Sequence, residues 1–192
     1  MKALKVILGV LVFIVLAFII LGLFLPSEIN VERSVTINAT PAEIHPYVNN
    51  FRKWSDWTAW AKKDTNLTNT YEGSESGVGS VYKWSGNEDV GNGMITMTKS
   101  DTSQGIRYDM SMEDGQFLSK GSIVYSPVED STAVTWSYQA DIGGNIIFKY
   151  AMVFIKPYIE HDFDEGLQRL KTLVESGSTA VQLDSLSKEQ EP

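Results

Sequence analysis

The two histidines of the chain, His45 and His161, are the first candidates for acid–base or metal chemistry. On a helix, His161 and Glu165 would be neighbours four residues apart and could supply two ligands to a metal ion. Two ligands do not complete a metal site, and a solvated, charged helix face explains the same residues. His45 precedes Pro46 in a short predicted helix, where we expect a surface or half-buried residue and not a catalytic base. We therefore predict no metal site and no catalytic histidine.

Other catalytic signatures are missing from the sequence. The chain has no cysteine, which excludes disulfides, thiolate metal sites and a cysteine nucleophile. It contains no G-x-S-x-G elbow, no phosphate-binding loop and no H-E-x-x-H motif. The inward positions of the predicted strands hold no carboxylate that could serve as a general acid or base. We expect ligand binding more than catalysis, and no cofactor.

Aromatic and methionine side chains are more informative, because they recur at every second position of several segments and would share one face of a sheet. Buried tyrosines and tryptophans need polar partners, which a ligand or water can supply. This favours a ligand cavity over the alternative of a packed core. The candidate cavity residues are Tyr82, Trp84, Met97, Tyr108, Met110, Tyr125, Trp136, Tyr138, Phe148 and Met152.

The elements that would position these residues begin with a strand at 31–37, where apolar and polar residues alternate. Thr40, Pro41 and Glu43 have the spacing of a capping box, which predicts a helix from Pro41 to about Asn49. Tryptophans follow at positions 54, 57 and 60, a spacing typical of one or two helical turns. We favour a packing plug at the end of the sheet for these rings, with an aromatic lid over a cavity as the alternative.

Between Thr68 and Ala140 the alternation continues through further strands, which predicts an antiparallel sheet with one buried face. Asp114-Gly115 predicts a hairpin, and Glu129-Asp130-Ser131 predicts a second one less strongly. The glycine pairs at 77/79 and 91/93 are typical of turns or bulges at strand starts.

A long amphipathic helix should close the domain. Residues 145–155 are nearly all apolar, and Phe163, Leu167, Leu170 and Val174 continue at helical spacing. Pro157 lies between these parts, so we expect a kink or an interruption there. Residues 178–192 are polar and predict a disordered tail.

The N-terminal segment 6–25 has no charged or polar side chain, and its twenty residues would span about 30 Å as a helix, the thickness of a bilayer core. It is too long for the apolar part of a signal peptide and lacks small residues before Pro26, which favours an uncleaved membrane anchor. Lys2 and Lys5 precede it, so the N-terminus is expected in the cytoplasm and the domain outside, as a single-pass protein of the cell (inner) membrane with a periplasmic or extracytoplasmic domain. Residues 26–30 would form a short linker.

The charge of the chain argues against a nucleic-acid partner. The formal net charge is −8, and the densest basic stretch, from Arg52 to Lys63, is broken by three tryptophans and an aspartate. Such a surface repels a phosphate backbone.

The order of these elements, and several short segments, resemble the SRPBCC superfamily, and among its members the membrane-anchored bacterial polyketide cyclase/dehydrase-like group. The segments that carry the resemblance are Val35–Ile44, Phe51–Trp57, Gly77–Trp84, Thr135–Trp136 and Asp162–Leu167. The resemblance implies an α+β helix-grip fold of the START type, a curved antiparallel sheet wrapped around a long C-terminal helix, over residues 31–177. Pro157 departs from the family pattern.

The resemblance also implies a function, the binding of an apolar or lipid-like ligand between the sheet and the C-terminal helix. With the anchor, we expect a membrane-attached domain that binds a hydrophobic small molecule or lipid. The alternatives are an enzyme of the polyketide cyclase or dehydrase kind that uses cavity tyrosines, and a structural or interaction module without a ligand.

Overall fold

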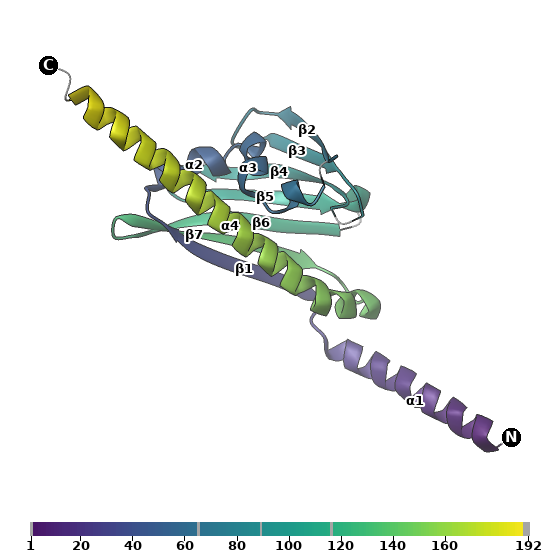
Figure 1. Ribbon diagram of the computed structural model, residues 1–192. Helices are drawn as coiled ribbons and strands as arrows, with labels where there is room; N and C mark the ends of the chain where they lie inside the picture. Colours follow the sequence, from purple (N-terminus) through teal and green to yellow (C-terminus); the bar gives the residue numbers. More distant parts are fainter. Residues whose placement is uncertain (1, 65, 89, 116, 190–192) are drawn as a thin grey trace.

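The computed structural model describes residues 2–64, 66–88, 90–115 and 117–189 (Figure 1). The chain begins with helix α1, Lys2–Phe24, which extends away from the rest of the molecule and exposes nearly all of its apolar side chains. By length and composition, α1 could cross a membrane. Leu25 to Ser27 connect it to the first strand.

Seven antiparallel strands form one sheet in the order β1-β7-β6-β5-β4-β3-β2, so the strands from β2 to β7 follow one another as a meander and β1 lies beside β7. Strand β1 starts at Glu28 and thereby takes up most of the expected linker at 26–30. Strand β2 begins at Thr68, where the predicted run of strands begins. The strands are β1 Glu28–Ile37, β2 Thr68–Gly73, β3 Ser80–Ser85, β4 Asn92–Asp101, β5 Gly105–Met112, β6 Phe117–Val128 and β7 Ser131–Asp141.

The short helices between β1 and β2 confirm the sequence patterns. Helix α2, Pro41–Val48, begins after Thr40, whose backbone N–H donates to the Glu43 carboxylate at 2.7 Å, as in a capping box. Three short pieces carry the tryptophans that follow: the 3₁₀ helices η1, Phe51–Lys53, and η2, Trp60–Lys62, with α3, Trp54–Trp57, between them. Both predicted hairpins are present, with the 3₁₀ turn η3, Glu113–Gly115, between β5 and β6.

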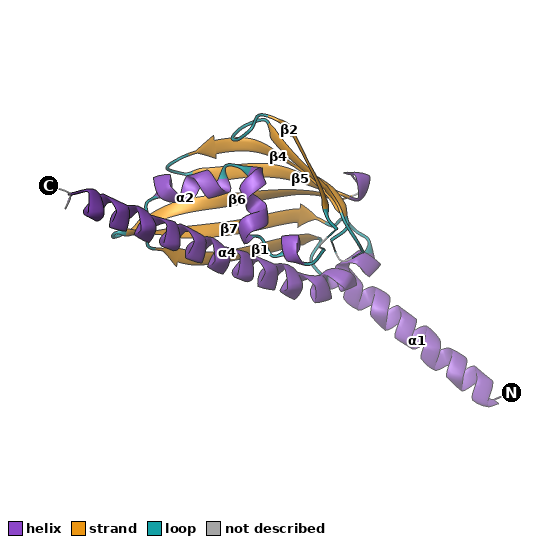
Figure 2. Ribbon diagram, turned by 45° about the horizontal axis from the view of Figure 1, so that its top comes forward, coloured by secondary structure: helices purple, strands orange, loops and turns teal. Residues whose placement is uncertain are grey.

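Helix α4, Ile146–Glu189, lies with the short helices on one face of the sheet and packs mainly over β1 (Figure 2). This is the predicted helix-grip arrangement. The expected interruption at Pro157 is wrong, because Pro157 lies inside a continuous helix. Proline has no backbone N–H, so the carbonyl of Val153, four residues earlier, lacks its usual donor in the helix. Both residues are exposed, so the missing hydrogen bond disturbs no packed surface. The helix also continues to Glu189, into the segment 178–192 for which disorder stays a prediction.

Candidate ligand-binding site

The middle of the space between the sheet and α4 is filled by aromatic rings. Trp136 of β7 is fully buried and stacks on Phe163 of α4, with 3.9 Å between ring centroids. Its indole N–H donates to the Tyr108 hydroxyl at 2.8 Å. Trp54 and Trp57 pack edge to face against Trp136, with centroids 6.0 and 5.1 Å away. The tryptophan run therefore lies inside the fold, as the packing-plug interpretation expects.

The buried polar atoms of these rings have partners within the protein. The indole N–H of Trp54 donates to the Val48 carbonyl and that of Trp57 to the Tyr47 carbonyl. Among the described residues, no deeply buried side-chain nitrogen or oxygen lacks a hydrogen-bond partner. The argument that tyrosines and tryptophans need a ligand for their polar atoms is therefore wrong for this interior.

The ten candidate cavity residues all come from the sheet or α4, but the structure places them in two different environments. One half is buried in the packed interior, namely Tyr82, Met97, Tyr108, Tyr125 and Trp136. The other half retains contact with solvent, namely Trp84, Met110, Tyr138, Phe148 and Met152. Phe148 is 39% exposed.

The five partly exposed residues lie toward the end of the sheet where α1 joins the domain, and we call them, with Met112 and Phe117, the proximal cluster. Strand register places Trp84, Gly93, Met112 and Phe117 side by side as the last inward row at this end. Phe117 meets Phe148 of α4 edge to face, with centroids 5.3 Å apart. Met112 and Phe117 were missed from the sequence, although the alternation from Met110 to Met112 points to the first of them.

The tyrosines near this region are neutral hydrogen-bonding groups. Burial raises the pKa of Tyr138, partly offset by a hydrogen bond with Ser119. Burial also raises the pKa of Tyr82 to about 12, with the neighbouring Tyr71 adding to the shift. Both hydroxyls therefore stay protonated at neutral pH and do not act as bases. The Tyr82 hydroxyl donates to Asn69 at 2.9 Å.

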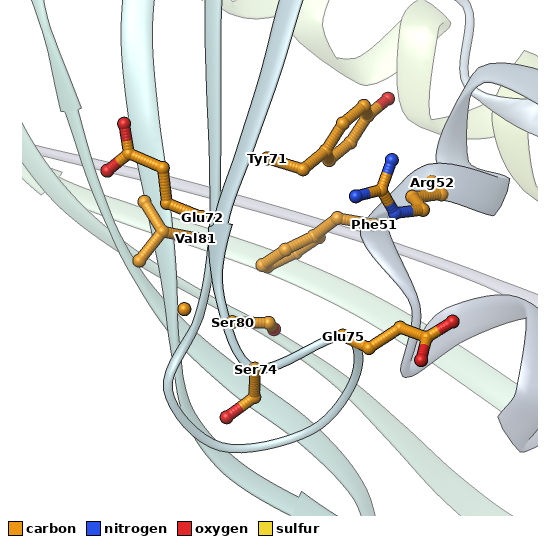
Figure 3. A pocket seen from close by; sticks show the side chains of 9 residues that line it. Phe51, Arg52, Tyr71, Glu72, Ser74, Glu75, Ser80 and Val81 are labelled. Carbon is orange, nitrogen blue, oxygen red and sulfur yellow. The ribbon is translucent and has the colours of Figure 1, made fainter.

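A hollow of ≈ 370 Å³ lies at the opposite end of β2 and β3 (Figure 3). Phe51 forms its apolar wall, and the charged side chains of Arg52, Glu72 and Glu75 surround it. The Arg52 guanidinium lies 4.6 Å from the centre of the Tyr71 ring. This hollow contains none of the ten candidate residues, and its charged rim does not suit an apolar ligand.

A larger open hollow of ≈ 840 Å³ runs along β3 to β6. Lys83, Met94, Asp109 and Leu118 line it, and these residues alternate with the inward residues of their strands. The hollow therefore lies mainly on the outer face of the sheet. Two members of the proximal cluster, Trp84 and Met110, also line this hollow.

His45 is buried, so our expectation of a surface or half-buried residue is wrong. Its Nδ1 lies 3.2 Å from the Tyr125 hydroxyl, and its Nε2 lies 3.1 Å from the Ser100 hydroxyl. Ser100 donates its own proton to Asn49, so Nε2 must be the nitrogen that donates to Ser100. Nδ1 then accepts from Tyr125. This tautomer cannot take a proton from Ser100, and the network is structural.

The acidic residues around His161 are held in ion pairs. Arg33 of β1 contacts Glu160 and Asp164 at 2.7 and 3.0 Å, and Lys63 contacts Asp162 at 2.6 Å. Glu165 pairs with Arg169, one turn further along α4. The pairs link α4 to β1 and to the end of η2, a structural role that differs from both metal binding and a freely solvated face.

Comparison with known proteins gives one family match. The sequence profile of the family described as "Polyketide cyclase / dehydrase and lipid transport" matches residues 28–175, which is most of the chain outside α1 and the C-terminal segment. A search of curated proteins found no significant match.

Solved structures with the same fold are similar to this chain at low sequence identity. The aromatase/cyclase di-domain protein StfQ of the steffimycin biosynthetic pathway has a TM-score of 0.59 and 10% identity over 79% of this chain and 52% of its own. A protein from Thermus thermophilus has a TM-score of 0.58 and 15% identity, and Ara h 8.0201 has 0.51 and 14%. Each of these last two aligns over 78% of this chain and 99% of its own. These likenesses concern the fold.

Proposed function

Because this chain belongs to the polyketide cyclase/dehydrase and lipid transport family of the SRPBCC superfamily, we propose that it is a membrane-anchored domain that binds a hydrophobic small molecule or lipid. The ligand would contact the proximal cluster, between the inner face of the sheet and the first turns of α4. The folded unit is the segment matched by the family, with α1 as its anchor.

The half-exposed state of the proximal cluster carries this proposal. The rest of the inner face is closed by Trp136, Phe163 and the tryptophans of α3, whereas Trp84, Met110 and Phe148 stay accessible. Apolar surface that a ligand covers contributes about 25 cal/mol per Å² to binding. Methionine side chains adapt to ligands of different shape, and the cluster contains three of them, at 110, 112 and 152.

Binding is better supported than catalysis. The proximal cluster contains no carboxylate or histidine, and its one tyrosine, Tyr138, has a raised pKa because it is buried. Acid–base chemistry on a polyketide would need a group that changes its protonation state near neutral pH. The one buried histidine is held in the structural network with Tyr125 and Ser100.

The location of the domain is part of the proposal. We place α1 across the cell membrane, with Lys2 and Lys5 on the cytoplasmic side and the domain on the other. The connection from Leu25 to Ser27 is only a few residues long, so the domain stays at the membrane surface. A ligand drawn from the bilayer would thus be near the proximal cluster at high effective concentration.

The proposal can be tested by filling the site. The full-length protein is purified in detergent, bound molecules are extracted and identified by mass spectrometry, and binding of a fluorescent fatty acid is titrated. The variant Met110→Trp places a larger ring in the proximal cluster, and we expect at least about a tenfold loss of affinity. The control Met94→Trp puts the same ring on the outer face of the neighbouring strand, where Met94 is 37% exposed, and should bind as the natural protein does.

Equal binding by the natural protein and by Met110→Trp, both with native circular dichroism, would reject the site. An extract without any apolar molecule, together with no binding of the fatty acid, would reject the function itself.

A further inference from the structure

We propose that the first four turns of α4 lie in the surface layer of the same bilayer that holds α1, with one face of the helix against lipid. This inference rests on the proposed anchor and adds a second membrane contact. It concerns the outer side of α4, opposite the side that meets the proximal cluster.

An apolar stripe on α4 stays mostly exposed to solvent in the described part of the chain. Ile147, Phe154 and Tyr158 are spaced by seven and four residues and therefore share one face of the helix. They are 73%, 71% and 71% exposed. Large apolar side chains this accessible, grouped on one helix face, mark a surface that is covered in the working state of a protein.

Contacts between α4 and α1 place this stripe at the edge of the bilayer. The Tyr150 ring stacks on Phe18 with centroids 4.1 Å apart, and its hydroxyl donates to the Phe18 carbonyl at 2.8 Å. Ile146 packs on Gly22, where a Cβ would overlap it. The first turn of α4 is therefore level with the last turns of the apolar segment 6–25, where hydrocarbon gives way to headgroups.

A lysine of α4 also caps the C-terminal end of α1 at the boundary between hydrocarbon and headgroups. Lys149 is 9% exposed, and its ammonium donates to the Leu25 carbonyl at 2.8 Å. The contact joins α4 to the first carbonyl after the end of α1. A membrane-spanning α1 thus fixes the depth of the first turn of α4.

The charge pattern also favours a lipid surface over a protein partner. The chain has 24 acidic residues and a net charge of −8, but none of the acidic residues lies between Asp141 and Glu160. The only charged residues in that interval are Lys149 and Lys156. Lys149 is buried against Leu25, and Lys156 lies 3.8 Å from Glu160, so the segment exposes apolar side chains and no acidic group that anionic phospholipid headgroups would repel.

The arrangement gives α4 two working faces. Ile147 and Phe154 would face lipid. Phe148 and Met152 belong to the proximal cluster and lie on the side of the helix that packs against the domain. A lipid or apolar molecule that leaves the bilayer beside Phe154 would reach the cluster without crossing bulk water. The first turns of α4 would then form the entrance to the site.

The inference is tested by measuring how deeply labelled residues of α1 and α4 lie in the bilayer. The chain has no cysteine, so single-cysteine variants can be labelled with an environment-sensitive fluorophore without background. The full chain is reconstituted into vesicles of phosphatidylcholine and phosphatidylglycerol that contain spin-labelled lipid as a quencher. The variants are Ile147→Cys and Phe154→Cys on the stripe, Phe13→Cys in α1, and Val128→Cys at the far end of β6. Phe13 and Val128 are 72% and 47% exposed.

We expect spin-labelled lipid to quench the labels at 13, 147 and 154 and to leave the label at 128 unchanged. Quenching at 13 alone would overturn the inference and leave the anchor intact. No quenching at any position would overturn both. A blue-shifted label at 154 that lipid does not quench would reveal a second copy of the chain on the stripe and would also overturn the inference. Ligand recovery from the purified protein is measured separately, so failure of the proposed function has a different readout.

Discussion

Gly121 leaves no space for a side chain, because the aromatic ring of Tyr108 lies directly against its Cα. Gly121 lies opposite Tyr108 and Tyr138 in the strand register, and a Cβ there would overlap the Tyr108 ring. The hydroxyl of Tyr108 in turn accepts the hydrogen bond from the indole N–H of Trp136. The absence of a side chain at 121 therefore makes the central packing possible.

We predict that Gly121→Ala lowers the free energy of unfolding by about 1–3 kcal/mol, because Tyr108 must shift and weaken its contact with Trp136. Guanidinium titration followed by tryptophan fluorescence measures the change. The control Gly144→Ala adds a Cβ where no atom lies within 4 Å and should be nearly neutral. Equal effects of the two substitutions would contradict the packing role of Gly121.

His45 should make the domain sensitive to mild acid. Burial lowers the pKa of His45 below 6.5, and the charge of Asp101 opposes this shift in part. Below pH 6.5 the unfolded chain therefore binds a proton more readily than the folded one, so the contribution of neutral His45 to stability is lost as the pH falls from 6.5 through the folded pKa.

We expect the free energy of unfolding to fall between about pH 7 and pH 5, and His45→Gln to flatten this dependence. Denaturant titrations at several pH values measure the slope. His161→Gln, which changes an exposed histidine on α4, is the matched control and should retain the natural slope. A slope that His45→Gln leaves unchanged would assign the acid sensitivity to other groups.

At the scale of elements, α4 is held to the sheet by its buried face and by ion pairs across it. Arg33 points inward from β1 and contacts both Glu160 and Asp164. One guanidinium thus joins two turns of α4 to the edge strand. The contacts lie near the surface, with the Arg33 side chain 33% exposed.

We predict that Arg33→Ala destabilises the fold by about 1 kcal/mol, since exposed pairs contribute little alone and somewhat more when one guanidinium serves two carboxylates. The loss should shrink at high salt. Lys83→Ala removes the more exposed pair with Glu72 and should cost less. The measurement is a denaturant titration at low and high salt, and a salt-independent loss would point to packing in place of charge.

The elements that we predicted correctly are those that residues close together in the sequence determine. Thr40, Pro41 and Glu43 lie within one turn and start α2, and the alternation from Ile106 to Met112 produces β5 without reference to distant residues. The burial of His45 was not predictable in this way, because Ser100 and Tyr125 come from strands far along the chain.

The candidate site was predicted as one set of inward residues, and the structure divides it into a closed part and an open part. The sequence reveals which side chains point inward, but not that Trp54 and Phe163 meet Trp136 and fill the middle. Continuity through Pro157 likewise depends on which side of α4 stays exposed, and this follows from packing against β1.

At the scale of the whole molecule, α1 and the domain are joined by more than the covalent connection. Gly22 packs on Ile146, and Lys149 caps the Leu25 carbonyl. Gly22→Leu should separate the two helices, since its side chain would occupy the position of Ile146. We expect faster amide hydrogen exchange in the first turns of α4 for this variant in lipid nanodiscs.

The control for this change is Gly9→Leu, at a glycine of α1 with no atom within 4 Å of an added Cβ. It makes the same substitution in the same helix and should leave hydrogen exchange in α4 unchanged. Equal exchange in both variants would show that the contact between α1 and α4 contributes nothing to the order of α4.

The route from α1 into β1 also has a mechanical consequence. A pull on the anchor enters at Glu28 and runs along the axis of β1, whose ten residues pair with β7 from Glu28–Asp141 to Ile37–Thr132. With handles at the N-terminus and at Val128, force would shear this ladder, whereas handles at the N-terminus and Gly143 would peel it open one rung at a time. We expect a clearly higher rupture force for the first pair in single-molecule stretching. A force along β1 that draws the far end of the sheet away from the anchor would then load the edge strand in the direction in which a β-ladder resists best.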